Sequence, residues 1–223
     1  MAHLLAVDLG YRPAHVLTSV VSNLPPERYP DFPAKIEFWH RVLTEVRAIP
    51  GVESAAAVIG VPLSGNFPAR LFRIEGAPEV SGDLRPKAEI VPASDGYFGT
   101  IGIPVLRGRE WTAEEIAAGR RVALINEVAA ARFWPGRGPI GKRLSLDVQP
   151  GRPWLEIIGI VKATREDSPD KPPSPAIYLP MEQAQPFFPQ FLAVRTAAGR
   201  PFGAAACNLL RLLDGMVVRH WYP

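Results

Sequence analysis

The glycines and the lysine that follow Pro135 have the spacing that most closely resembles a chemical site. The stretch Gly-Arg-Gly-Pro-Ile-Gly-Lys begins at Gly136 and ends at Lys142. It fits the dinucleotide pattern G-x-G-x-x-G and the first seven positions of the P-loop pattern G-x-x-x-x-G-K. In such loops, main-chain N–H groups at the start of a helix bind a phosphate. One hypothesis is therefore a nucleotide- or phosphate-handling enzyme that uses the loop from Gly136 to Lys142.

The elements expected around this loop favour a different interpretation. A phosphate loop leaves a strand and opens a helix, whereas here the order is reversed. The sequence predicts a strand at residues 121–125, a helix N-cap at Asn126 and a short helix at residues 128–134. The glycines therefore follow the end of a helix. Arg143 stands where Mg²⁺ would need Ser or Thr, and Pro139 has no N–H to offer. We interpret the glycines as a helix stop and a turn into the next strand.

Other reactive residue types have structural explanations. Thr112 and Glu115 form a capping-box pattern, in which Glu115 caps a brief helix and Glu114 complements its dipole. Ser64 lies outside any G-x-S-x-G elbow. The single cysteine, Cys207, excludes an intrachain disulfide. None of the four histidines lies within metal-ligand spacing of another or of the cysteine: His3, His15, His40 and His220. We therefore predict no catalytic, cofactor-binding or metal-binding residue, no cofactor and no enzymatic activity.

Composition indicates a globular protein without a nucleic-acid partner. The 223 residues carry 25 basic and 22 acidic side chains, for a net charge of +3, without long blocks of one sign. Five basic residues form a locally basic region: Arg132, Arg137, Lys142, Arg143 and Arg152. We interpret this region as a solvated face, because it lacks a ladder of aromatic residues on which bases could stack. No secretory signal peptide and no apolar run of about 20 residues are visible.

Periodicity predicts an N-terminal β-α-β layer. Residues 15–22 form an apolar, β-branched run, residues 34–49 place apolar side chains at helical spacing, and residues 52–58 form a second apolar run. Asp31 is the expected helix cap, and Trp39 is expected in the core. A right-handed crossover and a parallel pair of strands are the default for such a unit.

Shorter elements follow, and the β-α pattern returns near the end. Strands are expected at 71–75, 87–91, 154–161, 176–180 and 191–196, with a helical turn at 95–102 closed by glycine and a last helix at 202–213. Two proline-rich connectors, at 24–33 and 168–175, are candidate hinges. We predict an α+β fold whose N-terminal layer is interrupted by a smaller mixed α/β subdomain. The predicted boundaries are 1–66, 67–187 and 188–223, where the last segment completes the layer begun by the first.

The order of these pieces resembles the periplasmic core domain of MacB-type ABC transporter permeases, in the form found in FtsX-like permeases of acidobacterial type. The residues that carry the resemblance span most of the chain: Gly10 to Leu17, Leu24 to Pro30, Leu43 to Ala57, Phe72 to Gly76, Tyr97 and Phe98, Ile101 to Pro104, Leu106 to Arg109, Ile125 to Glu127, Phe133 to Pro135, Pro139 to Leu144, Ile157 to Val161, and Ile177 to Pro180.

The resemblance implies a porter-like β-α-β subdomain with an inserted subdomain, and a mechanical role without chemistry. It also implies a place outside the cytoplasmic membrane and partners that include the rest of a permease and a separate cytoplasmic ABC ATPase. A dimer mate or an envelope protein is a further implied partner.

The ends of the chain depart from the family pattern. The flanking transmembrane helices are missing, and residues 213–219 lack the proline-bearing continuation into the next membrane span. These departures indicate a truncated or frame-shifted remnant. An autonomous soluble interaction module is the third hypothesis, beside the permease domain and the phosphate-handling enzyme.

Overall fold

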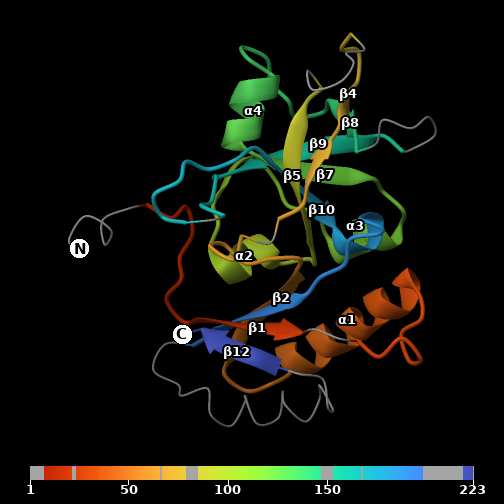
Figure 1. Cartoon of the computed structure of the whole chain (residues 1–223), viewed down its shortest axis with the longest axis vertical. Helices are drawn as coiled ribbons and strands as arrows, with labels where there is room; N and C mark the ends of the chain where they lie inside the picture. The colour runs from red at the N-terminus through yellow and green to blue at the C-terminus, as the bar shows by residue number, and fades with distance from the viewer. Residues whose placement is uncertain are drawn as a thin grey trace.

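The computed structural model describes residues 8–21, 24–65, 67–78, 85–146, 153–166 and 168–197, and the backbone of 218–222. The long axis of the molecule runs from α1 (Phe32–Arg47), at one end, to the short strands β4 (Arg73–Ile74) and β8 (Arg143–Ser145), at the other (Figure 1). The helix predicted at 202–213, and with it Cys207, lies outside the described residues.

The remaining elements follow the expected order. The strands are β1 (Val16–Val21), β2 (Val52–Val58), β3 (Ala69–Leu71), β5 (Lys87–Ala93), β6 (Val105–Gly108), β7 (Val122–Asn126), β9 (Leu155–Val161), β10 (Ala176–Pro180), β11 (Phe191–Thr196) and β12 (Val218–Tyr222). The helices are α2 (Tyr97–Ile101), α3 (Ala113–Ala117), α4 (Glu127–Phe133) and the 3-10 turn η3 (Met181–Gln183). The fold class is α+β.

One mixed sheet joins these strands in the order β12-β1-β11-β2-β5-β10-β7-β9-β8-β4, while β3 pairs with β5 and β6 with β9. The expected direct parallel pairing of β1 with β2 is wrong, because β11 lies between them and is antiparallel to both. The two N-terminal strands still point the same way, so the β-α-β unit is split by a strand from the far end of the chain. β2 and β5 meet only at their ends in the described sheet: Val58 pairs with Ala93, and the N–H groups of Ile59 and Ser94 donate to the carbonyls of Pro92 and Ala57 at 3.0 and 2.8 Å.

The single strand predicted at 71–75 is in fact two. β3 pairs with β5, whereas β4 pairs with β8. Phe72, between them, is 1% exposed, so the chain turns its side chain into the core where it changes partners. The strand β6 was not expected, because its exposed Leu106 and Arg107 break any apolar pattern.

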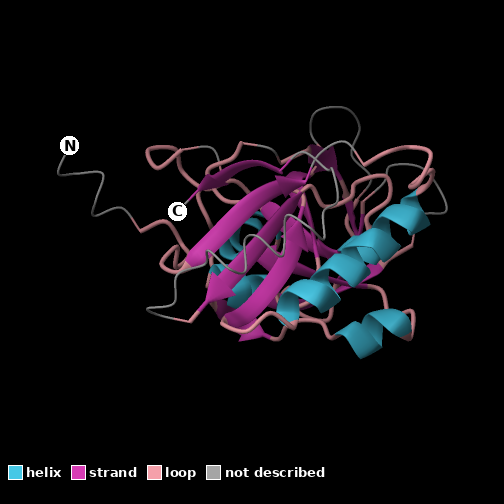
Figure 2. Ribbon diagram, turned by 90° about the horizontal axis from the view of Figure 1, so that it is seen from below, coloured by secondary structure: helices cyan, strands magenta, loops and turns pink. Residues whose placement is uncertain are grey.

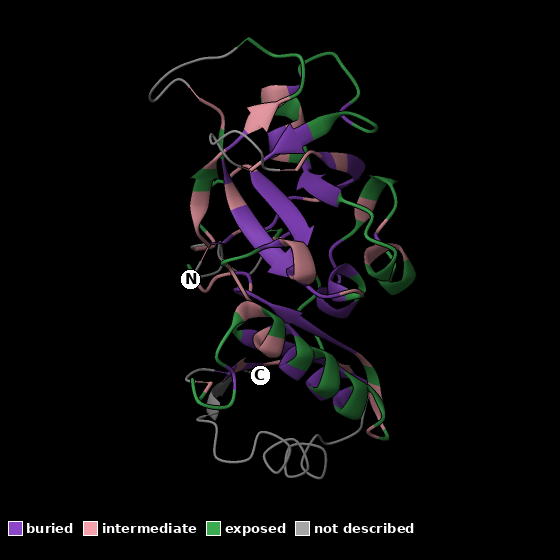
Figure 3. Ribbon diagram, turned by 90° about the vertical axis from the view of Figure 1, so that its right-hand side faces the viewer, coloured by how far each residue is buried: buried purple, intermediate pink, exposed green. Residues whose placement is uncertain are grey.

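α1 covers one face of the first half of the sheet (Figure 2). Asp31 caps it by accepting the N–H of Ala34 at 2.9 Å, as expected. Its apolar stripe, with Trp39 fully buried, packs on the side chains of β2 and β11 that point the same way. The opposite side of the helix is exposed to solvent (Figure 3). The amphipathic spacing read from the sequence is thus the packing that holds this helix in place.

The central strands are buried on both faces, because side chains alternate along a strand. In β10, Ile177 and Leu179 join the core beneath α4, whereas Ala176 and Tyr178 join a core on the other face. Such strands read as continuous apolar runs rather than as alternating ones.

The helix α2 covers the face that both halves of the sheet share. Tyr97 and Phe98, each 1% exposed, belong to one cluster with Ala56 and Val58 of β2 and with residues of β5, β7 and β10. Phe98 meets the rings of Tyr178 and Trp111 edge-to-face, with centroids 5.1 and 5.6 Å apart. A single apolar core therefore spans both halves, although β2 and β5 pair only at their ends.

Asn126 ties three segments together through one buried side chain. As predicted, it caps α4: its Oδ1 accepts the N–H of Ala129 at 2.8 Å. The same oxygen accepts the N–H of Ala176 at 3.1 Å, and Nδ2 donates to the carbonyl of Ser174 at 2.7 Å.

Replacing Asn126 with alanine should lower the free energy of unfolding by about 3 kcal/mol, because a helix cap is lost and buried polar groups lose their partner. The matched control Asp31→Ala removes an exposed cap and should cost only about 1 kcal/mol. Urea denaturation monitored by circular dichroism measures both. Equal losses would show that the buried bonds from Asn126 to 174–176 contribute nothing.

Candidate functional site

The loop from Gly136 to Lys142 is a turn in which the main-chain N–H groups of Arg137, Gly141 and Lys142 donate to main-chain carbonyls. It follows the C-terminus of α4, with Gly136 and Gly141 at positive φ angles of 66° and 81°. The N–H of Gly141 donates to the carbonyl of Ile157 at 2.8 Å, and the N–H of Lys142 donates to the carbonyl of Pro139 at 3.0 Å. These bonds lead the chain into β8 and β9. The turn read from the sequence is confirmed.

The basic side chains around this turn form an exposed surface, as expected. Arg132, Arg137, Lys142 and Arg143 are all exposed, while Arg152 lies outside the described residues. Arg143 forms an ion pair with Glu75, and its Nε donates to that carboxylate at 2.8 Å. The Arg143 contact lowers the pKa of Glu75.

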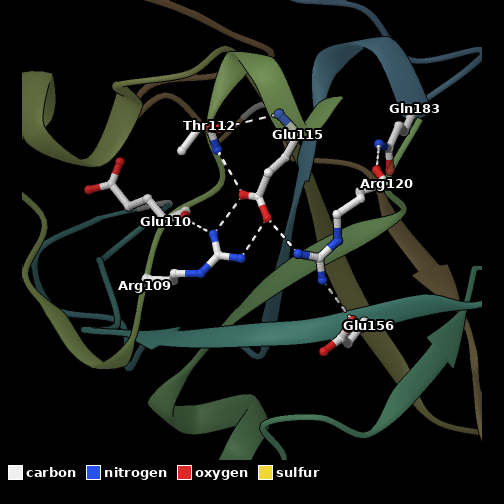
Figure 4. Close-up of polar contacts among 7 residues, drawn as sticks. All are labelled: Arg109, Glu110, Thr112, Glu115, Arg120, Glu156 and Gln183. Atoms are coloured by element: carbon white, nitrogen blue, oxygen red, sulfur yellow. Dashed lines mark hydrogen bonds and ion pairs between the residues drawn. The ribbon is translucent and has the colours of Figure 1, made fainter. Parts of the chain in front are cut away.

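Glu115 is the centre of a charge cluster (Figure 4). The predicted capping box is present: Glu115 N–H donates to Thr112 Oγ1 at 3.3 Å, and Thr112 N–H donates back to the carboxylate at 3.2 Å. The carboxylate also accepts Arg109 and Arg120, at 2.6 and 2.7 Å. Hydrogen bonding to Arg109 is the main cause that lowers the pKa of Glu115 to about 2. A permanently ionised carboxylate is unsuited to general acid–base work near neutral pH.

The histidines described by the structure do not form a metal site. His40 lies on α1 with Nε2 3.2 Å from the carboxylate of Glu182. Among the described residues, no three His, Cys, Asp or Glu side chains are grouped so that they could hold a metal ion. Among the same described residues, the buried hydroxyl of Ser64 has no hydrogen-bond partner.

Arg195 connects three segments, although no pattern in the sequence singled it out. Its guanidinium donates three bonds of 2.9 Å: Nε to the carbonyl of Thr100 in α2, and the two terminal nitrogens to the carbonyls of Ala14 and Arg12. Because a guanidinium holds its donors in a rigid fork, these bonds fix the spacing of three segments. The signal in the sequence was a charged residue inside an otherwise apolar strand.

The N-terminal segment at residues 8–12 is held by further contacts, and with the Arg195 bonds they form what we call the junction. Arg12 N–H donates to the carbonyl of Ile101 at 3.2 Å. Lys162 forms an ion pair with Asp8, and the N–H of Arg165 donates to the carbonyl of Leu9 at 3.3 Å. A Cβ at Gly10 would lie 2.0 Å from the carbonyl oxygen of Ala163, so only glycine fits this crossing. The segment therefore contacts the loop after β9 and the end of α2 before it enters β1.

No helix in the described parts of the chain is long and apolar enough to cross a membrane.

Comparison with known proteins gives a consistent result. The family model of the MacB-like periplasmic core domain matches residues 12–209. An uncharacterized ABC transporter permease of Bacillus subtilis (strain 168), YknZ, is 25% identical over 118 residues, which are 53% of this chain. The chain spans about a quarter of that relative's length, since the match covers 26% of it.

Two solved structures share the fold. The periplasmic region of MacB from Actinobacillus actinomycetemcomitans superposes with a TM-score of 0.62 and 14% identity, covering 95% of this chain and 88% of that one. The extracellular domain of the noncanonic ABC-type transporter YknZ from Gram-positive bacteria gives a TM-score of 0.61 and 15% identity, covering 92% and 97%. With the family model matched over residues 12–209, the chain belongs to the family of MacB-like periplasmic core domains.

Proposed function

We propose that this chain is a non-catalytic, extracytoplasmic domain of an ABC transporter permease, which relays conformational change and contacts substrate or envelope partners. Membership of a family of periplasmic core domains supports the location. The occupied donors of the turn around Gly141 and the ion pairs of Glu115 support the absence of catalysis. The partners in this proposal are the rest of the permease, a separate cytoplasmic ABC ATPase and a dimer mate or envelope protein.

We also propose the division into residues 1–66, 67–187 and 188–223, where the first and last segments form the porter-like subdomain and the middle one is inserted. The sheet order supports it, because β12, β1, β11 and β2 are neighbours and the strands from β5 onward follow as a second group. Within the middle segment, Met181 of η3 packs in the same cluster as Trp39 of α1. The exit of the inserted subdomain is thus anchored on the porter-like one.

The junction at Arg195 is the observation that carries the relay. A motion that enters through residues 8–12 acts on β1, on α2 through Thr100 and Ile101, and on the loop after β9 through Asp8 and Lys162. Residues 8–12 therefore contact both proposed subdomains, so their displacement would act on both. Rigid hydrogen bonds of this kind transmit a displacement without any chemical step.

A label at the far end of the inserted subdomain tests the relay. In a permease that carries this domain together with its ATPase, a spin label at Arg137→Cys, with Cys207 replaced by serine, should change its spectrum on ATP addition. Arg195→Met should abolish this change while ATP hydrolysis continues, because the junction loses its three bonds. The matched control Arg70→Met removes an exposed arginine stacked on Phe187 and should leave the response intact. A wild-type spectrum that does not change on ATP addition would refute the relay. A spectral change retained in Arg195→Met would refute the role of the junction.

Nucleotide titration tests the alternative enzyme. We expect no saturable binding of ATP to the 223-residue chain, because the N–H groups of Gly141 and Lys142 are engaged with main-chain carbonyls. Isothermal titration calorimetry with Mg²⁺ and ATP is the measurement. Saturable binding that disappears in Lys142→Ala would favour the phosphate-handling enzyme.

The pH dependence of stability tests the structural role of Glu115. The unfolded chain binds a proton at Glu115 near the ordinary pKa of 4.5, whereas the folded chain does so near about 2. The stabilisation is therefore present above pH 4.5 and is lost as the pH falls toward 2. The difference in unfolding free energy between the wild type and Glu115→Gln should shrink over that range. The double variant Arg109→Gln/Arg120→Gln should lose the same pH-dependent stabilisation. Both variants retaining the wild-type pH dependence of unfolding free energy would contradict the structural role of Glu115.

A further inference from the structure

A pocket of about 290 Å³ lies beside the N-terminal segment. Its walls come from residues 8–12, from α2 and the residues that follow it, and from Glu110 and Lys162. Phe98, Ile103 and Val105 give it an apolar floor. The volume is at the lower limit of typical ligand pockets, roughly 300–1,000 Å³, so it suits a small ligand.

Two opposite charges in this pocket have no counter-ion within the part of the chain that the structure describes. Asp8 and Lys162 pair with each other. Among the described residues, neither the carboxylate of Glu110 nor the guanidinium of Arg12 forms an ion pair or side-chain hydrogen bond. The carboxylate of Glu110 points away from the Glu115 cluster (Figure 4). Glu110 is half-buried, and burial raises its pKa. A half-buried carboxylate without a partner gains from a cation that replaces lost water.

The glycines of α2 leave this pocket open. A Cβ at Gly99, within the helix, would meet nothing within 4 Å, and Gly99 lines the pocket. Glycine inside a helix costs about 1 kcal/mol relative to alanine, so the bare position is not explained by helix stability. At Gly102 a Cβ would lie 2.8 Å from Cβ of Arg12, and so glycine lets the arginine pass close to the helix end.

We propose that this pocket binds a small zwitterion with an apolar body, about the size of a dipeptide. Its ammonium group contacts Glu110, its carboxylate contacts Arg12, and its apolar part lies on Phe98, Ile103 and Val105. A ligand with one charge only would leave the other protein charge unpaired, and this mismatch gives the site its selectivity. The inference does not depend on the relay proposed above.

The test uses the full 223-residue chain and three matched probes: the dipeptide Ala-Phe with free termini, its N-acetyl form without the ammonium group, and its C-terminal amide without the carboxylate. Amide chemical shifts in a ¹⁵N NMR titration report binding and its place. Ala-Phe should shift Gly99 and Gly102 saturably, and each capped form should bind at least about tenfold more weakly, because a charge-assisted hydrogen bond is lost.

Variants assign the contacts. Glu110→Gln and Arg12→Gln should each weaken Ala-Phe binding at least about tenfold, and Gly99→Leu should block it. Glu114→Gln and Gly138→Leu, an exposed carboxylate and a glycine with open space around it, are the matched controls and should bind normally. Thermal melting checks that each variant is folded. Absent binding of Ala-Phe up to about 10 mM, equal binding of the capped forms, or an unaffected Glu110→Gln would each overturn the proposal.

Discussion

The structure depends on the burial of one apolar face that both halves of the sheet share. The rings of Tyr97 and Phe98 in α2 lie under strands from both halves, and Trp111 and Tyr178 complete the same cluster. Each buried aromatic side chain contributes a few kcal/mol of apolar burial. Separating the halves would expose all of these rings, so the packing of α2 reinforces the short contact between the ends of β2 and β5.

The polar contacts of the chain work toward the same end. The side chains of Arg195 and Asn126 donate their hydrogen bonds to main-chain carbonyls. The carboxylate of Glu115 binds two arginines and caps the start of α3. Such groups position segments, and their charges are already neutralised or bonded. They have a structural role, in keeping with a family of periplasmic core domains.

Local features were predictable because a few neighbouring residues encode them. The caps at Asp31, Thr112 and Asn126 and the glycine stop at Gly102 were all read from short patterns and are all present. Apolar runs located the long strands, since those strands are buried on both faces.

The partners of those strands were not predictable, because an apolar run does not say which neighbour it pairs with. Nothing in residues 191–196 places β11 between β1 and β2, and strands as short as β4 and β8 carry no periodicity. The bonds of Arg195 go to carbonyl oxygens, which every residue has, so no pattern marks their other ends. Arg12 and Glu110 are distant in sequence and line the same pocket only in three dimensions.

The position of β11 sets the order in which the chain can fold. β1 and β2 are synthesised early, yet neither has a hydrogen-bonded neighbour in the first half of the sheet until residues 191–196 emerge. Long-range pairing of this kind slows folding and leaves strand edges open in the meantime. α1 can form and pack on two separated strands, but the layer closes only when its middle strand arrives. Closure of the layer that β1 and β2 begin is therefore coupled to β11, whose residues are synthesised more than 130 positions after β2.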